Sequence, residues 1–184
     1  PGWSTAGFDD REWSGVRTLL LAILLVSVAS AEQNKTVVGP SNANLAAGSE
    51  ALLARDAELS RIVNLVGPEA LSSAQRWELE GAALVKEAVL QQSALDDADS
   101  YCSPQKQFQL LELVMQVFDR GMELIGLGAP VQELAEHPVM ARIRRAKSTW
   151  RSEEIAGLGA FANEVYDTLA ALHSEYASSK EAAS

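Results

Sequence analysis

The sequence predicts an all-α protein: an antiparallel helical bundle preceded by an irregular N-terminal arm and a short apolar segment. After residue 40, apolar residues recur at spacings of three and four, the period of a helix with one buried face. No stretch of that region alternates with the period of two that a strand requires. Gly, Pro and Ser residues divide it into segments with short connections. Helices of this kind, joined by short loops, are typical of an antiparallel bundle.

The composition allows one hydrophobic core and argues against some classes of function. The chain has 184 residues, of which 47% are apolar, and a formal net charge of −10. This acidic balance disfavours a general nucleic-acid binder, which needs a basic surface. One local exception is a basic run with no acidic residue, and it contains Arg142, Arg144, Arg145, Lys147 and Arg151. The single cysteine, Cys102, provides neither an internal disulfide nor a zinc-binding spacing.

The chain is predicted to have three parts. Residues 1–44 form an N-terminal arm with an apolar segment and a linker, residues 45–177 form the bundle, and residues 178–184 form a frayed tail. Within the arm, about a dozen apolar residues follow Arg17 and end in the small residues 29–31. This segment has three open interpretations: a signal peptide, a short membrane anchor, or a buried helix or strand.

The first two helices of the bundle are predicted over about residues 46–66 and 72–95. Gly67 and Pro68 end the first helix, and Ser72 with Gln75 resembles a capping box at the start of the second. The expected buried positions of the first are Leu52, Leu59, Ile62, Val63 and Val66, and those of the second are Trp77, Gly81, Leu84, Ala88 and Gln92.

The third helix has the clearest periodicity. Ser103 is a suitable N-cap and Pro104 a suitable first helical residue, and a GlyLeuGly sequence at 126–128 ends the helix. Its length is about 33 Å at roughly 1.5 Å per residue. Its expected buried stripe consists of Phe108, Leu111, Met115, Phe118, Met122 and Ile125.

The remaining chain predicts two short helical segments and a long last helix. The first short segment begins at Pro130, and the second covers about residues 139–147 after His137-Pro138. The last helix is expected to begin at a Ser152 cap followed by two glutamates in the first turn. Its expected buried stripe is Ile155, Leu158, Ala162, Val165, Leu169, Leu172 and Tyr176.

No residue pattern predicts a catalytic or metal site. Neither GxxxxGK[ST] nor GxGxxG occurs. The two histidines are predicted to be a turn residue (His137) and a solvated helix residue (His173). The cluster of Asp96, Asp97 and Asp99 lacks the Gly and Glu of a calcium loop, so these residues are expected to form turns and caps. An enzyme that uses Asp96, Asp97 or Cys102 remains a further hypothesis.

Two longer motifs carry a resemblance to a known family. The sequence contains IVNLVGPEAL at 62–71 and QQSALDDADSYCSPQKQ at 91–107, and HPVMARIRRAK follows at 137–147. These segments resemble the C-terminal helical domain of the catalytic A subunit of V-type and archaeal-type ATPases. The family's phosphate loop and catalytic Glu are absent from this sequence, so the chain is not expected to hydrolyse ATP by itself.

The resemblance implies a fragment or truncated paralogue of the A subunit of a rotary ATPase or ATP synthase, whose bundle contacts neighbouring subunits and the central stalk in ATP-coupled proton or sodium transport. It implies that Gln92, Ala94 and Leu95 border an adenine pocket, although a Phe usually stands where this chain has Leu95. ATP or ADP with Mg would be bound by the whole complex and no cofactor by this chain alone. The implied partners are the ATPase B subunit together with the central-stalk subunit, with no nucleic acid, in a cytoplasmic complex peripheral to the membrane.

A second hypothesis is a stand-alone helical adaptor that is exported or membrane-anchored through residues 17–31. It would place the protein in a secreted or periplasmic location.

Overall fold

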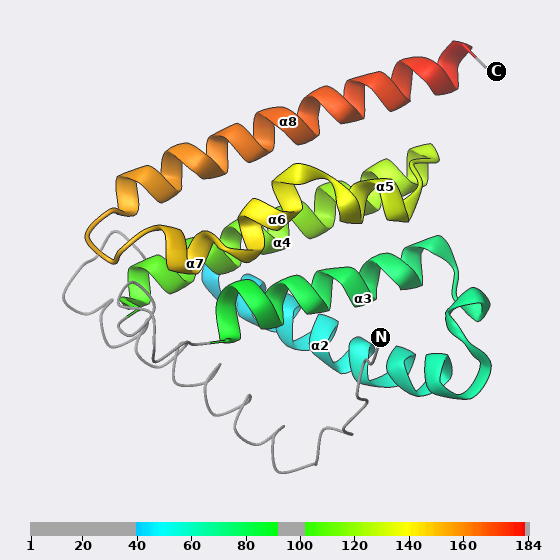
Figure 1. Cartoon of the computed structure of the whole chain (residues 1–184), viewed down its shortest axis with the longest axis horizontal. Helices are drawn as coiled ribbons and strands as arrows, with labels where there is room; N and C mark the ends of the chain where they lie inside the picture. The colour runs from blue at the N-terminus through cyan, green and yellow to red at the C-terminus, as the bar shows by residue number, and fades with distance from the viewer. Residues whose placement is uncertain (1–39, 92–101, 183–184) are drawn as a thin grey trace. The chain divides into compact units, whose positions relative to one another are not determined.

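The computed structural model describes residues 40–91 and 102–182, and every described element is helical. The all-α prediction is therefore confirmed for the part of the chain that is described. The elements are α2 (Pro40–Val66), η1 (Pro68–Ala70), α3 (Ser73–Val85), η2 (Lys86–Leu90), α4 (Pro104–Leu127), α5 (Val131–Glu136), α6 (Pro138–Arg144), α7 (Ala146–Thr149) and α8 (Ile155–Ala182) (Figure 1). None of these helices combines the length and the apolar character needed to cross a membrane.

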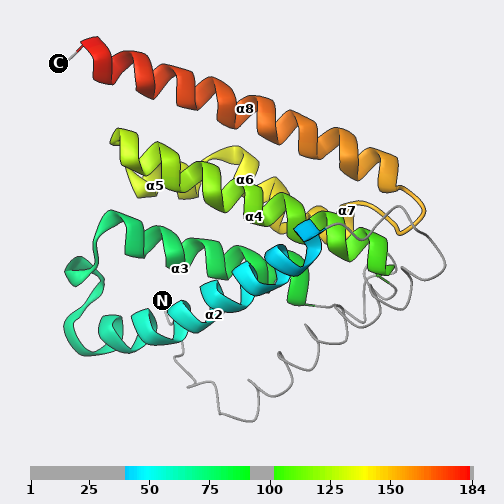
Figure 2. The same cartoon turned by 180° about the vertical axis from the view of Figure 1, so that it is seen from behind.

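The chain divides into two compact units, 1–50 and 51–184. The described part of the first unit is the beginning of α2, where the Ser49 hydroxyl donates to the carbonyl of Ala46 at 2.9 Å. The second unit is the bundle, in which the long helices α3, α4 and α8 are antiparallel to the segment before each of them, while α5, α6 and α7 follow one another in one direction (Figures 1 and 2). Helix α4 lies at its centre, where it contacts α3, η2 and α8.

Local signals set several helix ends as predicted. Ser72 and Gln75 form a reciprocal capping box at the start of α3. The Ser103 hydroxyl accepts from the N–H of Lys106 at 3.2 Å, and Pro104 is the first residue of α4. At the other end of α4, Gly128 has a φ of 106°, a left-handed conformation that favours glycine. The cap predictions for both helices are confirmed.

Other boundaries differ from the predictions. Helix α2 begins at Pro40, inside the segment predicted to be a linker, because proline is favourable in a first helical turn and Ala and Leu residues follow it. Helix α3 changes to π-helical geometry at Lys86. Helix α8 includes residues 178–182, which the sequence predicts to be part of a frayed tail. The predicted division between arm and bundle at 44/45 stays a prediction.

The central position of α4 changes which of its residues are buried. Leu111 and Met115 of the predicted stripe are buried, whereas Phe108 and Phe118 are only half-buried. The fully buried positions lie around more than half of the helix: Lys106, Leu110, Leu111, Leu113, Val114, Met115, Val117, Gly121 and Leu124. A single stripe of buried residues is expected for a helix that packs on one side only. Helix α4 packs against several elements, so more of its circumference is buried.

Trp77 joins α3 to α4. Its indole is 1% exposed, and Nε1 donates to the carbonyl of Phe118 at 2.9 Å. The ring occupies the space above Gly121, where an added Cβ would lie 2.1 Å from Cζ2 of Trp77. A second contact has the glycine on α3 and the aromatic ring on α4. There, an added Cβ on Gly81 would lie 2.4 Å from Cδ2 of Phe118. Two glycines, one on each helix, therefore let these backbones approach each other.

Helix α8 is held by apolar contacts in its first half and by polar contacts beyond. Its buried residues are Leu158, Phe161, Val165 and Leu169. Beyond them, Leu172 and Tyr176 of the predicted stripe are only half-buried. The Tyr176 hydroxyl donates to Oε2 of Glu133 at 2.9 Å, and Nζ of Lys180 donates to the carbonyl of Gly126 at 3.2 Å.

A charged and aromatic cluster fixes the start of α8 against α6. The guanidinium of Arg142 makes a bidentate pair with Glu164, and its Nη2 lies 2.9 Å from Oε2. The same guanidinium lies 4.8 Å from the ring centroid of Phe161, and Phe161 stacks on Trp150 at 4.9 Å. The hydrogen bond and the positive charge of Arg142 lower the pKa of Glu164.

The glycine contacts predict opposite effects of one substitution at two positions of α4. Gly121→Ala places a methyl group inside the Trp77 ring and is expected to lower the free energy of unfolding by about 1–3 kcal/mol. Gly126→Ala, five residues along the same helix, meets no atom within 4 Å. It is expected to be neutral or to stabilise by roughly 0.5–1 kcal/mol. Urea denaturation followed by circular dichroism measures both, and equal effects of the two changes would contradict this account.

The Arg142–Glu164 pair predicts a pH-dependent contribution to stability. Because folding lowers the pKa of Glu164, the contribution is complete above the carboxyl's unfolded pKa, near 4.5, and is lost as the pH falls through the lower folded pKa. The melting temperature of Glu164→Gln should therefore lie below that of the unmodified chain near neutral pH and approach it below about pH 4. Both groups are exposed, so high salt should reduce the difference.

The matched control for this effect is Arg142→Met. In that background, Glu164→Gln should no longer change the melting temperature in a pH-dependent way. A constant difference between Glu164→Gln and the unmodified chain from neutral pH to pH 3 would count against the pair.

Candidate functional site

The junction, residues 91–107, is described only at its two ends. Gln91 is its upstream end, and residues 102–107 are its downstream end. The predicted site residues Gln92, Ala94 and Leu95 lie outside the described residues, as does the Asp96–Asp99 cluster. The structure therefore shows how the bundle holds this segment at each end.

The upstream end leaves the bundle from a π-helical turn. The N–H of Gln91 donates to the carbonyl of Lys86 at 2.7 Å, which is the five-residue spacing of a π-helix. The ammonium of Lys147 donates to the carbonyl of Val89 at 3.1 Å and also to the carbonyl of Gln91. The last carbonyls of a helix have no partner within the helix. Lys147 thus caps the end of η2 from another element.

Lys147 belongs to the one-turn helix α7, and a second lysine binds its main chain. The ammonium of Lys106 donates to the carbonyl of Lys147 at 2.7 Å. Lys106 is 0% exposed and Lys147 is 4% exposed. A buried cation needs such partners because it loses its hydration on folding. These two lysines connect the end of η2, α7 and the first turn of α4.

The downstream end is attached to the same region of the bundle. The N–H of Ser103 donates to Oγ of Ser152 at 3.0 Å. The sequence assigns Ser152 to the N-cap of the last helix, which is wrong, because α8 begins at Ile155 and the Ser152 hydroxyl faces the start of α4. We call residues 147–152, which contact both ends of the junction, the junction support.

Ion pairs fix α6 to η2 next to the junction support. Arg144 binds Oε2 of Glu87 at 2.6 Å and Oε2 of Glu80 at 3.1 Å. Partial burial lowers the pKa of Arg144, but the hydrogen bonds and charges of Glu87 and Glu80 outweigh this effect and raise it. Lys86, on the same turn, pairs with Asp56 of α2. The π-turn is therefore held by charged groups from two other helices.

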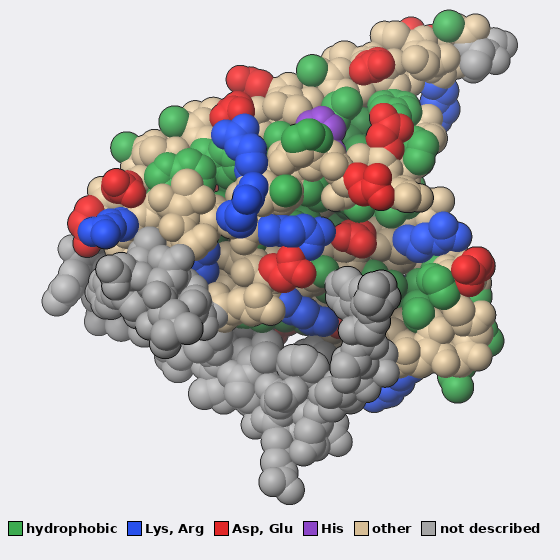
Figure 3. All heavy atoms as spheres, in the orientation of Figure 1, with side chains coloured by type: hydrophobic (Ala, Val, Ile, Leu, Met, Phe, Trp, Pro, Cys, Tyr) green, Lys and Arg blue, Asp and Glu red, His purple; other side chains and the backbone are tan. Residues whose placement is uncertain are grey.

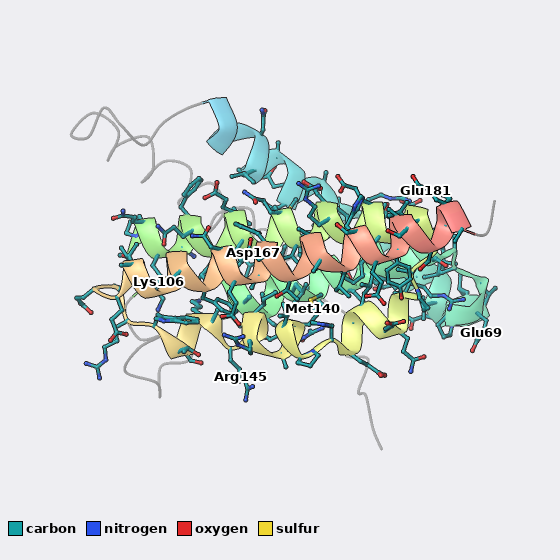
Figure 4. All side chains as sticks on the ribbon, turned by 90° about the horizontal axis from the view of Figure 1, so that it is seen from above. Glu69, Lys106, Met140, Arg145, Asp167 and Glu181 are labelled. Atoms are coloured by element: carbon teal, nitrogen blue, oxygen red, sulfur yellow. The ribbon has the colours of Figure 1, made fainter. Side chains whose placement is uncertain are left out.

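The basic run does not form an open basic patch, because most of its cations are paired within the bundle. Arg142, Arg144 and Lys147 all have the internal partners described above. On the face seen in Figure 3, Lys and Arg side chains lie beside Asp and Glu side chains. Arg145 is exposed and points away from the bundle (Figure 4), with its Nε bonded to the carbonyl of Ala141 at 3.3 Å. The apolar residues Val139 and Ile143 of the same run face inward and are buried.

His137 lies in a turn, as the sequence predicts, whereas His173 is less exposed than the solvated helix residue that the sequence predicts. Nδ1 of His137 accepts from the N–H of Val139 at 3.3 Å and so caps α6. His173 is half-buried on α8. Within residues 40–91 and 102–182, no group of three His, Cys, Asp or Glu side chains is placed to hold a metal ion.

The turn between α2 and α3 forms a second candidate surface, at the other end of the bundle. Leu65 is 84% exposed and Val66 is 64% exposed. We call these two residues the hairpin tip. The prediction that Val66 is buried is wrong, because α2 ends at Val66 and the chain turns at Gly67, whose φ is 89°. Apolar side chains that are contiguous on a surface mark contact sites more often than single ones do, and the two residues of the hairpin tip are adjacent.

Sequence reasoning missed the role of the two buried lysines. One available signal was the place of Lys106 in the first turn of α4, where the helix dipole disfavours a positive charge. A lysine at this position is favourable when a carbonyl on another element accepts a hydrogen bond from its ammonium, as that of Lys147 does here. Lys147 carried no comparable signal, since it follows two exposed or half-buried arginines in one basic run.

The comparisons with known proteins agree with the resemblance of the two motifs. A family described as the C-terminal domain of V and A type ATP synthase matches residues 31–126. The V-type ATP synthase alpha chain of Nitrosococcus oceani is 54% identical over 126 residues, which are 68% of this chain and 21% of that protein. The A subunit of the A-type ATP synthase of Thermococcus onnurineus is 39% identical over 107 residues, or 58% of this chain and 18% of that protein.

The chain thus spans about a fifth of the length of the curated relatives that it matches. The matched region contains the hairpin tip, the π-turn, the junction and most of α4. On this match over more than half of its residues, the chain belongs to the family of the C-terminal domain of V- and A-type ATP synthases.

Proposed function

We propose that this bundle works within a rotary ATPase or ATP synthase, as the C-terminal domain of the A subunit does. In this role it contacts the central stalk and a neighbouring B subunit, and it takes part in ATP-coupled proton or sodium transport. The observation that carries the proposal is the family match, which includes both the junction and the exposed hairpin tip. The chain is not catalytic by itself in this proposal, and its location is cytoplasmic and peripheral to the membrane.

The packing of the bundle suits the transmission of a displacement. Close-packed interiors deform little, so a force on one helix moves its neighbours. Helix α3 is tied to α4 by the Trp77 contact, and η2 is tied to α2 and α6 by ion pairs. A contact made at the hairpin tip therefore acts on the end of a continuous rod, α3 with η2, that leads to the junction.

The hairpin tip is the proposed contact with the central stalk. Leu65 and Val66 are the large apolar side chains most exposed in the described part of the chain. Burying such a side chain in an interface is worth about 1.5–3 kcal/mol. Exposed Arg61 and Glu69 lie on either side of the tip in sequence and provide polar contacts at its rim.

Nucleotide is proposed to bind the assembled complex rather than this chain. By the resemblance, Gln92, Ala94 and Leu95 would border the adenine of ATP or ADP, with Mg held elsewhere in the complex. The described ends of the junction fix where this segment leaves and rejoins the bundle. Exposed Arg145 and Arg151 remain available to steer a neighbouring subunit.

The contact proposal predicts a loss of binding when the hairpin tip is made acidic. The complete chain is titrated with either of two proteins of the same organism, the B subunit or the central-stalk subunit, and binding is followed by calorimetry. The double substitution Leu65→Asp and Val66→Asp should weaken stalk binding by at least about 100-fold, from the loss of two buried apolar groups. Binding to the B subunit should be unaffected, because the tip is not its contact.

The matched control is Ala160→Asp. Ala160 is exposed near the start of α8, which lies at the opposite end of the bundle from the α2–α3 turn (Figure 1). This variant adds one negative charge, compared with two in the tip variant, and should keep the affinity for the stalk. Equal stalk affinity of the tip variant and the control would exclude the tip as the contact. No binding of the unmodified chain to either subunit would contradict the proposed function itself.

A further inference from the structure

Both ends of the junction are bound to one short segment of the bundle. The upstream end is bound through the Lys147 ammonium, which holds the carbonyls of Val89 and Gln91. The downstream end is bound through the N–H of Ser103, which donates to Ser152. Lys147 and Ser152 are the first and last residues of the junction support, so a displacement of this segment acts on both ends.

The two buried lysines act in series. Lys106, from the downstream end, binds the main-chain carbonyl of Lys147 at 2.7 Å. Lys147 then binds the carbonyls of the upstream end with its side chain. Lys106 therefore positions the residue that holds the upstream end. Loss of either lysine removes a link from one continuous path between the two ends.

We propose that Lys106 and Lys147 form a serial clamp that couples the two ends of the junction, so that both ends are released together. This is a property of the chain by itself and does not depend on the function proposed above. It requires that the hydrogen bonds at Gln91 and those at residues 102–106 break in one and the same local unfolding event. Independent attachment of each end would make them two separate events.

The π-turn is the element on which such a release would act. π-Helical turns are rare and occur frequently at functional sites. This turn contains one residue more per turn than an α-helix, and Lys147 binds the carbonyls at its end. When the clamp is released, the carbonyls of Val89 and Gln91 lose the Lys147 ammonium, and the end of the π-turn can change to α-helical hydrogen bonding. That change rotates the direction in which the chain leaves the helix by roughly 100°, the angle per residue of an α-helix.

The choice of lysine at these positions also favours a coupling role. Replacing buried charged groups by apolar residues of similar size is often neutral or stabilising, so burial of two ammonium groups is not explained by stability alone. Methionine has a similar length and no charge. Lys→Met variants therefore remove the clamp while filling the same space in the core.

The experiment measures amide hydrogen exchange, residue by residue, by NMR on the complete 184-residue chain. Two amides report on the ends: the N–H of Gln91, bonded to the carbonyl of Lys86, and the N–H of Lys106, bonded to Oγ of Ser103. Lys147→Met and Lys106→Met should each raise the exchange rate of both reporters on the order of tenfold or more, because each removes charge-assisted hydrogen bonds. The double variant should exchange no faster than the faster single variant, since the links are in series.

The matched control is Arg120→Met. Arg120 lies on α4, as Lys106 does, but pairs with Glu123 at 2.8 Å on the exposed side of the helix, so this substitution removes a paired cation away from both ends of the junction. It should leave the Lys106 amide unchanged. The amide of Val117, in the buried centre of α4, reports global unfolding and should be unaffected in both clamp variants.

Three results would overturn the serial clamp. The first is that each lysine variant changes only the end that it touches. The second is an equal rise at Val117, which would mean global destabilisation. The third is no change at either reporter. Should a Met variant fail to fold, Lys147→Gln and Lys106→Gln keep a polar group with too short a side chain, and the same both-ends pattern is expected of them.

Discussion

Two ammonium groups, those of Lys106 and Lys147, are removed from water inside the bundle, and each must be compensated by oxygen atoms at a fixed distance. The oxygens are main-chain carbonyls at the ends of η2 and within α7. A side chain can be repacked, but a carbonyl moves only with its backbone. The placement of α7 relative to α4, and of η2 relative to α7, is therefore set by these hydrogen bonds as much as by apolar packing. The attachment of the junction depends on both.

Apolar packing fixes the rest of the bundle around α4. The Trp77 indole needs the missing side chain of Gly121, and Phe118 needs that of Gly81, so the two helices fit only in one register. The indole N–H is satisfied by the carbonyl of Phe118, which fixes the ring as well. Helix α8 then covers α4 with the first half of its length. The Trp77 contact restrains α3 near its start, and the Lys147 hydrogen bonds restrain η2, which continues α3 at its other end. The run of α3 and η2 is thus restrained at both ends.

The parts of the fold that the sequence predicts are those that depend on neighbouring residues. The Ser72–Gln75 capping box, the Ser103-Pro104 start and the Gly128 end are local, and all are confirmed. The failures depend on distant contacts. The stripe of α4 is too narrow because several helices pack on it, and Val66 is exposed because α2 ends beyond the core. Ser152 satisfies the local rule for an N-cap, but the N–H of Ser103, 49 residues away, is its partner.

The hairpin tip and the junction lie at the two ends of one rod, and this connects the proposed contact with the proposed clamp. Leu65 and Val66 precede α3 by a short turn, and Gln91 follows η2 directly. Helix α3 and η2 together comprise residues 73–90, or about 27 Å at 1.5 Å per residue. In the proposed assembly, a push on the tip would act on this rod along its axis. In the same proposal, the π-turn is the point where the rod changes length, by gaining or losing the extra residue of its wider turn. In the proposed assembly, a displacement of the hairpin tip therefore moves the junction only if the lysine clamp allows the π-turn to change its hydrogen bonding.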